Sequence, residues 1–300
     1  MFEYQYVQTG VAWLGFLWWP VVTQLIWTGY YTIGAVMVVS GLMMQYGSVR
    51  PESVFAYRRF IRKTVDVMIW DAATEGTNGQ LLPHGKLDNV REVLLLIPHG
   101  MLCIEGGAVL SHYLGEVREA RRYICLIDRT LYALSPPAVL MTGLSGSGSV
   151  EILNHVSVQR SLTQPDRPSL VVFPGGFVEA VGNTPEEQTL YTKTYSYWIK
   201  QCIKYKMRLR VMHVYNGSSM FPQSSKFPDF RQRMAAQYSI PILLPISPMR
   251  IIPRLYARTW TYSPDDVQTL ATATIEAHIR DFQQLDWSTQ LPRIRIRSSI

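Results

Sequence analysis

The feature that most constrains this chain is a long uncharged stretch at its N-terminal end. Between Glu3 and Arg50 there is no Asp, Glu, Lys or Arg, and the stretch includes four Trp residues and an apolar run from Ile33 to Met44. A helix that crosses a bilayer needs roughly twenty apolar residues, and this stretch is about twice as long. We therefore expect residues 1–50 to be a hydrophobic membrane anchor and residues 51–300 to be a separate globular domain.

Turn-forming and polar residues interrupt the anchor, and they leave two arrangements open. These residues are Pro20, Thr23, Gln24, Gly29, Tyr30 and Tyr31. The anchor is either a short helical hairpin that enters the membrane and returns, or one full span with an interfacial flank. Aromatic residues toward its edges are typical of a membrane interface. A buried hairpin of a soluble protein is the alternative without a membrane, whereas a secretory signal would carry a basic N-terminal region.

The charge pattern after the anchor indicates which side of the membrane the domain occupies. Five basic residues follow, opposed only by Glu52: Arg50, Arg58, Arg59, Arg62 and Lys63. Basic residues beside a membrane segment favour the cytosolic side and attract anionic headgroups. The net charge of +7 also suits nucleic acid, but there is no zinc-ligand spacing or RNA-binding aromatic signature, so we expect no nucleic-acid partner. Cys103, Cys125 and Cys202 stand in apolar surroundings and are expected to be free thiols.

Beyond the anchor, strand-like apolar runs alternate with helical patterns. This alternation predicts an α/β domain with a largely parallel sheet flanked by helices. The expected strands are Glu92 to Ile97, Tyr123 to Ile127, Val150 to Leu153, Ser169 to Phe173, Arg208 to Tyr215 and Arg258 to Tyr262. The expected helices are one from Pro51 with a loop up to Asn89, Met101 to Leu114, Thr130 to Thr142 with a break at Pro136-Pro137, Glu186 to Lys206, Asp229 to Tyr238 and Asp265 to Gln284. The tail with Arg293, Arg295 and Arg297 is expected to be solvated.

A histidine stands where the first expected strand ends. The segment Ile97-Pro98-His99-Gly100 leads from that strand toward the helix expected at Met101. Ligands of open α/β sheets bind at the carboxyl ends of strands, and the flanking proline and glycine stiffen the exit and let a substrate come close. Glu105 follows inside an apolar run, where an unpaired carboxylate is unfavourable. These residues favour His99 as a general base that Glu105 orients.

Structural interpretations of the histidines stay open at this point. A hydrogen-bonded histidine at a strand end would explain His99 without any chemistry. Pro83-His84-Gly85 repeats the same tripeptide in a polar loop, with no strand before it, so His84 is expected to be an ordinary loop residue. We expect His112, His155 and His213 to be structural.

A second strand exit combines glycines with a carboxylate. The strand ending at Phe173 continues as Pro174-Gly175-Gly176-Phe177-Val178-Glu179-Ala180. The amides of Gly175 and Gly176 could hold an oxyanion or a phosphate, although a simple turn would have the same sequence. Arg160 is a candidate for binding the phosphates of coenzyme A or the acceptor, and a plain surface arginine is the alternative.

In their order and spacing these pieces resemble the type-2 diacylglycerol acyltransferase family, within the glycerolipid acyltransferase superfamily. The resemblance consists of the hydrophobic anchor, Pro98-His99-Gly100, and Gly175-Gly176-Phe177-Val178-Glu179-Ala180, and it continues weakly into Asn216-Gly217-Ser218. Many members have a second histidine two positions before the catalytic one, where this chain has Ile97. The resemblance therefore leaves the subfamily open.

The resemblance implies an acyl-CoA-dependent O-acyltransferase with a glycerolipid-acyltransferase-like fold. His99 would be the base, Glu105 its acidic partner, and Pro98, Gly100, Gly175, Gly176, Glu179 and Arg160 would contact substrates. It implies no metal and no cofactor, with acyl-CoA as co-substrate, a lipid bilayer as partner, and residence in the endoplasmic reticulum membrane with a cytosolic catalytic domain. Acyl-chain preference, oligomeric state and transfer to lipid droplets stay open.

The acceptor is inferred from a missing arginine. Relatives that acylate glycerol phosphate or lysophosphatidate carry Phe-Pro-Glu-Gly-Thr-Arg at this turn, and arginine suits a phosphate. Here Phe177 and Val178 follow Gly176, so a neutral glycerolipid acceptor such as diacylglycerol, giving triacylglycerol, is favoured. A lysophospholipid or glycerol-phosphate acyltransferase, or a catalytically inactive membrane-anchored lipid-binding homologue, are the alternatives.

Overall fold

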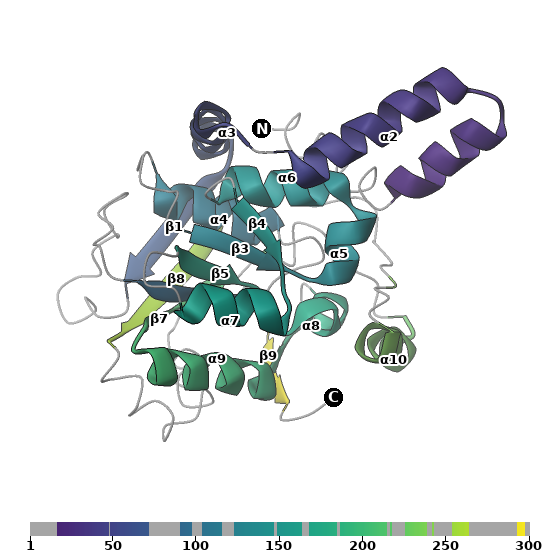
Figure 1. Cartoon of the computed structure of the whole chain (residues 1–300). Helices are drawn as coiled ribbons and strands as arrows, with labels where there is room; N and C mark the ends of the chain where they lie inside the picture. Colours follow the sequence, from purple (N-terminus) through teal and green to yellow (C-terminus); the bar gives the residue numbers. More distant parts are fainter. Residues whose placement is uncertain are drawn as a thin grey trace.

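The fold is seen in a computed structural model. It describes residues 17–47, 49–71, 91–97, 104–115, 123–146, 149–163, 168–184, 187–214, 217, 226–238, 242, 254–263 and 293–297. Within these residues the chain forms an α/β domain with a helical hairpin beside it (Figure 1).

A seven-stranded sheet forms the centre of the domain. Its strands in spatial order are β1 (Asp66–Asp71), β8 (Arg254–Tyr262), β7 (Arg208–Val214), β2 (Glu92–Ile97), β5 (Ser169–Val172), β3 (Tyr123–Ile127) and β4 (Ser149–Ile152). The strands from β7 to β4 run parallel, whereas β8 is antiparallel to β7 and pairs in parallel with β1. The predicted α/β class with a largely parallel sheet is therefore confirmed.

Helices cover both faces of the sheet (Figure 1). On one face lie α3 (Pro51–Thr64), α4 (Ile104–Leu114) and α6 (Pro136–Ser145); on the other lie α7 (His155–Thr163) and α9 (Thr192–Tyr205). Because both faces are covered, every residue of β2 is buried, with Leu94 facing the α4 side and Leu95 facing the α9 side. This explains why β2 has a continuous apolar run rather than an alternating pattern.

Several predicted elements differ from the structure. A helix followed by a loop was expected from Pro51, but the structure also has the strand β1 in this region. Only Val67 and Ile69 alternate as buried residues there, and this pattern is too short to predict a strand. The helix expected from Glu186 begins only at Thr192, after β6 (Glu187–Tyr191). The tail with Arg293, Arg295 and Arg297, where no strand was expected, forms β9 (Arg293–Arg297), which pairs with β6. The helix expected over 265–284 lies outside the described residues.

The described part of the predicted anchor forms a helical hairpin. Helical residues 17–27 are joined by a short turn to α2 (Tyr31–Tyr46), and the pair extends away from the sheet (Figure 1). Two glycines on α2 let the helices approach: a Cβ on Gly34 would lie 2.6 Å from Cγ1 of Ile26, and one on Gly41 would lie 2.6 Å from Nε1 of Trp18. The hairpin leaves much apolar surface exposed, including Trp27 and Met43.

Within the described residues, no helix alone has both the length and the apolar character that a membrane span needs, and the α2–α3 pair, bent by 92°, meets both only when taken together.

The base of the hairpin is joined to the domain through α5 (Arg129–Leu134). The amide of Gln45 donates to the carbonyl of Tyr132, and the Tyr132 hydroxyl donates back to the carbonyl of Gln45 at 2.8 Å. The indole of Trp19 donates to the carbonyl of Ala133 at 2.9 Å. Because α5 begins just after β3 ends, these bonds hold the hairpin base near the carboxyl ends of the parallel strands.

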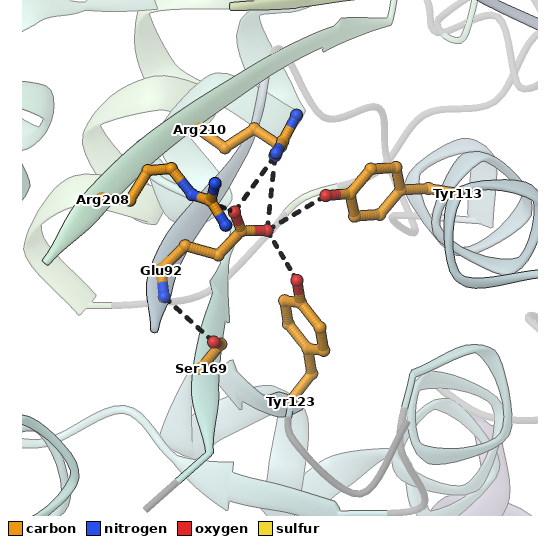
Figure 2. A network of polar contacts seen from close by, with 6 residues as sticks. All are labelled: Glu92, Tyr113, Tyr123, Ser169, Arg208 and Arg210. Carbon is orange, nitrogen blue, oxygen red and sulfur yellow. Dashed lines mark hydrogen bonds and ion pairs between the residues drawn. The ribbon is translucent and has the colours of Figure 1, made fainter. Parts of the chain in front are cut away.

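A buried carboxylate organises the opposite, amino end of the sheet (Figure 2). Glu92, the first residue of β2, accepts from the hydroxyl of Tyr113 at 3.1 Å and from that of Tyr123 at 2.6 Å. The guanidinium groups of Arg208 and Arg210 donate to it at 3.1 and 3.2 Å. Burial, reinforced by this carboxylate, raises the pKa of both tyrosines, so they stay protonated and donate. The network ties β2 to α4, β3 and β7.

One of the basic residues after the anchor is internal. Arg58 is 1% exposed, and its guanidinium donates to the carbonyls of Ser145 and Gly146 at the end of α6. Burial lowers its pKa to about 10, so it is still charged at neutral pH. Arg50, Arg59 and Lys63 are exposed. Arg58 therefore belongs to the packing of α3 on α6 and is not one of the solvent-exposed cations.

We predict that Arg58→Ala lowers the free energy of unfolding by about 2–4 kcal/mol, because two carbonyls at the end of α6 lose their buried donor. Arg59→Ala is the matched control, because Arg59 is the exposed neighbour on the same helix, and its effect should stay within about 0.5 kcal/mol. Denaturant melts in detergent would measure both. Equal effects of the two variants would contradict the structural role given to Arg58.

Candidate functional site

The topology of the sheet predicts a ligand site at the carboxyl ends of the parallel strands. The chain leaves β2 through α4 to reach β3 on one side, and later leaves β5 through α9 to reach β7 on the other side of β2. Ligands of open α/β sheets bind outside the carboxyl ends of strands at such a switch point. Three connections begin there, after β2, after β5 and after β7.

Glu105 lies at this edge, in the first turn of α4. Its side chain is fully buried. The partial positive charge of a helix N-terminus stabilises a carboxylate in the first turn. The residue therefore occupies the end of α4 that follows the connection from β2.

The other two connections contact the start of α4. A Cβ added to Gly217, the residue described after β7, would overlap with Cγ of Glu105, so only a glycine backbone fits against that carboxylate side chain. A Cβ added to Gly106 would lie 2.7 Å from Cε1 of Phe173, the residue that follows β5. Segments far apart in the sequence thus meet around Glu105.

The Gly175-Gly176 turn is formed around a second buried carboxylate. Gly175 has φ +87° and caps α8 (Gly176–Gly182), and Gly176 has φ +53°, conformations that favour glycine. The side chain of Glu179 folds over Gly175, where an added Cβ would overlap with its Cδ. The hydroxyl of Tyr195 donates to Oε1 of Glu179 at 2.8 Å, and burial, with the charge of Glu179, raises the Tyr195 pKa.

This arrangement limits what the turn can bind. A carboxylate already lies against Gly175, so a second anion there would meet like charge. Of the two residues that follow Gly176, Val178 is buried and Phe177 packs against the cluster of Val178, Val181 and Ala235. No basic side chain stands at these two positions.

The other predicted site residues fall in two groups. Pro98, His99 and Gly100 lie outside the described residues, as does His84. Arg160 lies on α7 and is about half exposed, and its guanidinium pairs with Glu151 of the edge strand β4 at 3.0 Å. The structure brings Glu105, the Phe173 turn and Gly217 together, and it gives Arg160 a surface ion pair instead.

His213 is a buried histidine on β7, beside the carboxyl end of β2. It pairs in register with Ile97, two residues before His99, from the neighbouring strand β7. Its Nε2 lies 3.3 Å from Oε1 of Gln188 on β6. Burial lowers its pKa to about 3, so the ring is neutral at physiological pH and acts as a hydrogen-bonding group of the core.

Two contacts at this edge could not be predicted from the sequence. Tyr195 lies within a helical pattern, and nothing in its spacing indicated that it would donate to Glu179. The pairing of Gln188 with His213 depends on β6, which was expected to be helical.

The described cysteines are chemically inert. Cys125 and Cys202 are buried free thiols, as expected, and burial raises the pKa of each to about 12, which keeps them unreactive at neutral pH. Among the residues that the structure describes, no group of three His, Cys, Asp or Glu side chains is placed to hold a metal ion.

Comparisons with known proteins give one distant likeness to report. No protein-family model matches the chain, and no curated protein matches it. A solved structure that matches is the 1-acyl-sn-glycerophosphate (LPA) acyltransferase PlsC from Thermotoga maritima, with 9% sequence identity and a TM-score of 0.44 over 95% of this chain and 100% of that chain. A likeness this distant carries no argument about activity.

We predict that Gly175→Ala destabilises the protein more than Gly176→Ala. Both variants force alanine into a positive-φ conformation, which costs about 1–3 kcal/mol. Only the Gly175 variant also drives a methyl group into Glu179, because an added Cβ at Gly176 has no atom within 4 Å. Thermal melts of the two variants measure the difference. Equal melting temperatures would show that Glu179 does not lie over Gly175.

Proposed function

We propose that this chain is a membrane-bound O-acyltransferase that transfers a fatty acyl group from acyl-CoA to the hydroxyl of a neutral glycerolipid, with diacylglycerol as the first candidate acceptor. The observation that carries the proposal is the convergence around Glu105. The helix that follows the Pro98-His99-Gly100 segment, the Phe173 turn that leads to Gly175, and the Gly217 connection meet at the carboxyl edge of the sheet.

The reaction needs a base that the motif supplies. Under this proposal the imidazole of His99 takes the acceptor's hydroxyl proton as the oxygen bonds to the thioester carbonyl carbon. The carbon–sulfur bond then breaks, and the proton passes to the departing thiolate, so that the ester and free coenzyme A are released. Glu105 is the positioning residue that holds the imidazole and stabilises its charged form.

A neutral acceptor is favoured by the charges at the Gly175 turn. The buried Glu179 carboxylate lies on Gly175, and apolar Phe177 and Val178 follow. Phosphate recognition draws on arginine or on free backbone amides. No arginine stands at the two positions after Gly176, and the Glu179 carboxylate against Gly175 disfavours a second anion, so an uncharged hydroxyl acceptor fits this turn better than lysophosphatidate or glycerol phosphate does.

The membrane part of the proposal is supported by the hairpin. Its exposed apolar side chains include Ile33, Val36, Val39 and Met43, a continuous surface of the kind that marks a membrane or protein contact. Exposed Arg50, Arg59 and Lys63 follow it and suit anionic headgroups. We propose that the hairpin anchors the protein in the endoplasmic reticulum membrane, with the catalytic domain in the cytosol.

The proposal is tested by acyl transfer with labelled oleoyl-CoA and a panel of acceptors: diacylglycerol, monoacylglycerol, lysophosphatidate and glycerol phosphate. We expect labelled triacylglycerol from the native chain and a fall of about 10²–10⁴-fold in His99→Ala, the usual contribution of a general base. His84→Ala is the matched control, because the same tripeptide surrounds it, and it should retain full activity.

Each outcome of this assay is informative. Preference for lysophosphatidate or glycerol phosphate would replace the neutral acceptor by a phosphorylated one. Product that His99→Ala leaves unchanged would overturn the mechanism. Absence of product with every acceptor, together with retained lipid binding, would favour an inactive lipid-binding protein.

We further predict that Glu105→Gln lowers kcat with little change in KM and moves the acidic limb of the kcat/KM profile to lower pH. A nearby carboxylate favours the imidazolium, so its neutralisation lowers the pKa of the base, by about one unit or more. Glu52→Gln on α3 is an exposed control and should leave the profile unchanged. A profile unaltered by Glu105→Gln, in a variant that melts normally, would exclude the positioning role.

A further inference from the structure

An exposed aromatic stripe on α10 (Pro228–Tyr238) has no role in the site described above. The helix packs on α8 through Ala235, which contacts Val178 and Val181, and Arg231 is buried on the same side. On the outer side, Phe230 and Tyr238 are each 57% exposed, and Phe227 just before the helix is 71% exposed. Exposure of large aromatic side chains to water is unfavourable. Several of them close together on one surface therefore indicate a binding partner.

The stripe has the spacing and the charges of an interfacial helix. Phe230, the partly exposed Met234 and Tyr238 lie four residues apart on one side of the helix, and Phe227 immediately precedes the helix. Exposed Lys226 and Arg233 flank it, and Asp229 is the one acidic residue of the helix. Aromatic rings beside basic side chains are typical of segments that lie in the headgroup region of an anionic bilayer.

The backbone holds Phe227 in an unusual conformation. Its φ of +52° is in the left-handed region that residues other than glycine rarely adopt. Its carbonyl accepts from the amide of Arg231 at 3.1 Å, which fixes the turn at the start of α10. The protein therefore keeps an exposed ring in a strained position, as happens where a side chain is needed for contact.

The stripe is at the same edge of the sheet as the hairpin. Helix α10 packs on α8, which starts after β5 ends, and the hairpin base bonds to α5, which starts after β3 ends. Figure 1 shows the hairpin and α10 on the right-hand side, away from β1. A bilayer that receives the hairpin therefore lies on the side of the domain from which α10 projects.

We propose that α10 is a second membrane-contacting element, whose aromatic stripe enters the headgroup region of an anionic bilayer. The proposal rests on the membrane residence given under the proposed function and extends it from one attachment to two. Contact at the hairpin and at α10 turns the edge with Glu105 toward the lipid, so that a bilayer acceptor reaches the site without leaving the membrane.

The contact is tested by fluorescence quenching that does not depend on enzymatic activity. Phe230→Cys and Tyr238→Cys are labelled with an environment-sensitive fluorophore in the full chain carrying Cys103→Ala, because Cys125 and Cys202 are buried. Tyr197→Cys is the matched control, an exposed tyrosine of α9 on a covered face of the sheet. The labelled protein is added to phosphatidylcholine vesicles with and without phosphatidylserine, containing a shallow nitroxide-labelled lipid.

We expect quenching at positions 230 and 238 at least about twofold above that at 197, and stronger with phosphatidylserine. Equal quenching at all three positions overturns the proposal. Fluorescence changes at 230 that depend on protein concentration in the absence of vesicles would assign the stripe to a second copy of the chain, and would also overturn it.

A kinetic measurement separates this proposal from the proposed activity. The double variant Phe230→Ser, Tyr238→Ser should lower transfer to diacylglycerol in vesicles several-fold and leave transfer to a dispersed short-chain diacylglycerol unchanged. Equal loss with both acceptors contradicts a membrane role for α10. If the native chain transfers to neither acceptor, the proposed activity fails, and the quenching result still decides whether α10 contacts the bilayer.

Discussion

The interaction on which the rest of the structure depends is the burial of the Glu92 carboxylate. A charge in the core has to be paired and hydrogen-bonded, and removing one partner of such a group is strongly destabilising. The partners of Glu92 come from β7, α4 and β3, so one side chain fixes three elements around β2 (Figure 2). The central strand is therefore held at its amino end, and its carboxyl end leads into the connection with the proposed base.

The same network bears on the proposed chemistry through α4. Tyr113, near the end of this helix, bonds Glu92, whereas Glu105 occupies its first turn. His112 adds a further tie, since its Nε2 lies 2.8 Å from the carbonyl of Val65. Helix α4 is thus anchored to the sheet at the end remote from the site. Because α4 is fixed to the sheet in this way, Glu105 keeps a constant position relative to β2. The proposed role of Glu105 in orienting an imidazole requires such a fixed position.

Features that depend on local interactions could be predicted from the sequence, whereas features that depend on contacts between distant segments could not. The buried strand β2 and the glycine turn after β5 were predictable, because continuous apolar runs and Pro-Gly pairs are local signals. Arg58 was expected among the surface cations, and its burial depends on carbonyls of α6 that no local pattern shows. The pairing of Glu179 with Tyr195, and the existence of β6, likewise depend on contacts between separate elements. The burial of Glu105 in the first turn of α4 and the approach of Gly217 to its side chain depend on contacts that only the fold provides.

The two-stranded sheet of β6 and β9 sets an order of assembly. Glu187 pairs with Arg293, so β6 cannot find its partner until the chain far downstream has been synthesised. Meanwhile Gln188 on β6 is the partner of His213, beside the carboxyl end of β2. The hairpin, in contrast, is made first and closes through near neighbours in the sequence. A nascent chain can therefore close its apolar hairpin long before β6 and β9 pair, so the small two-stranded sheet is completed late in the synthesis of the domain.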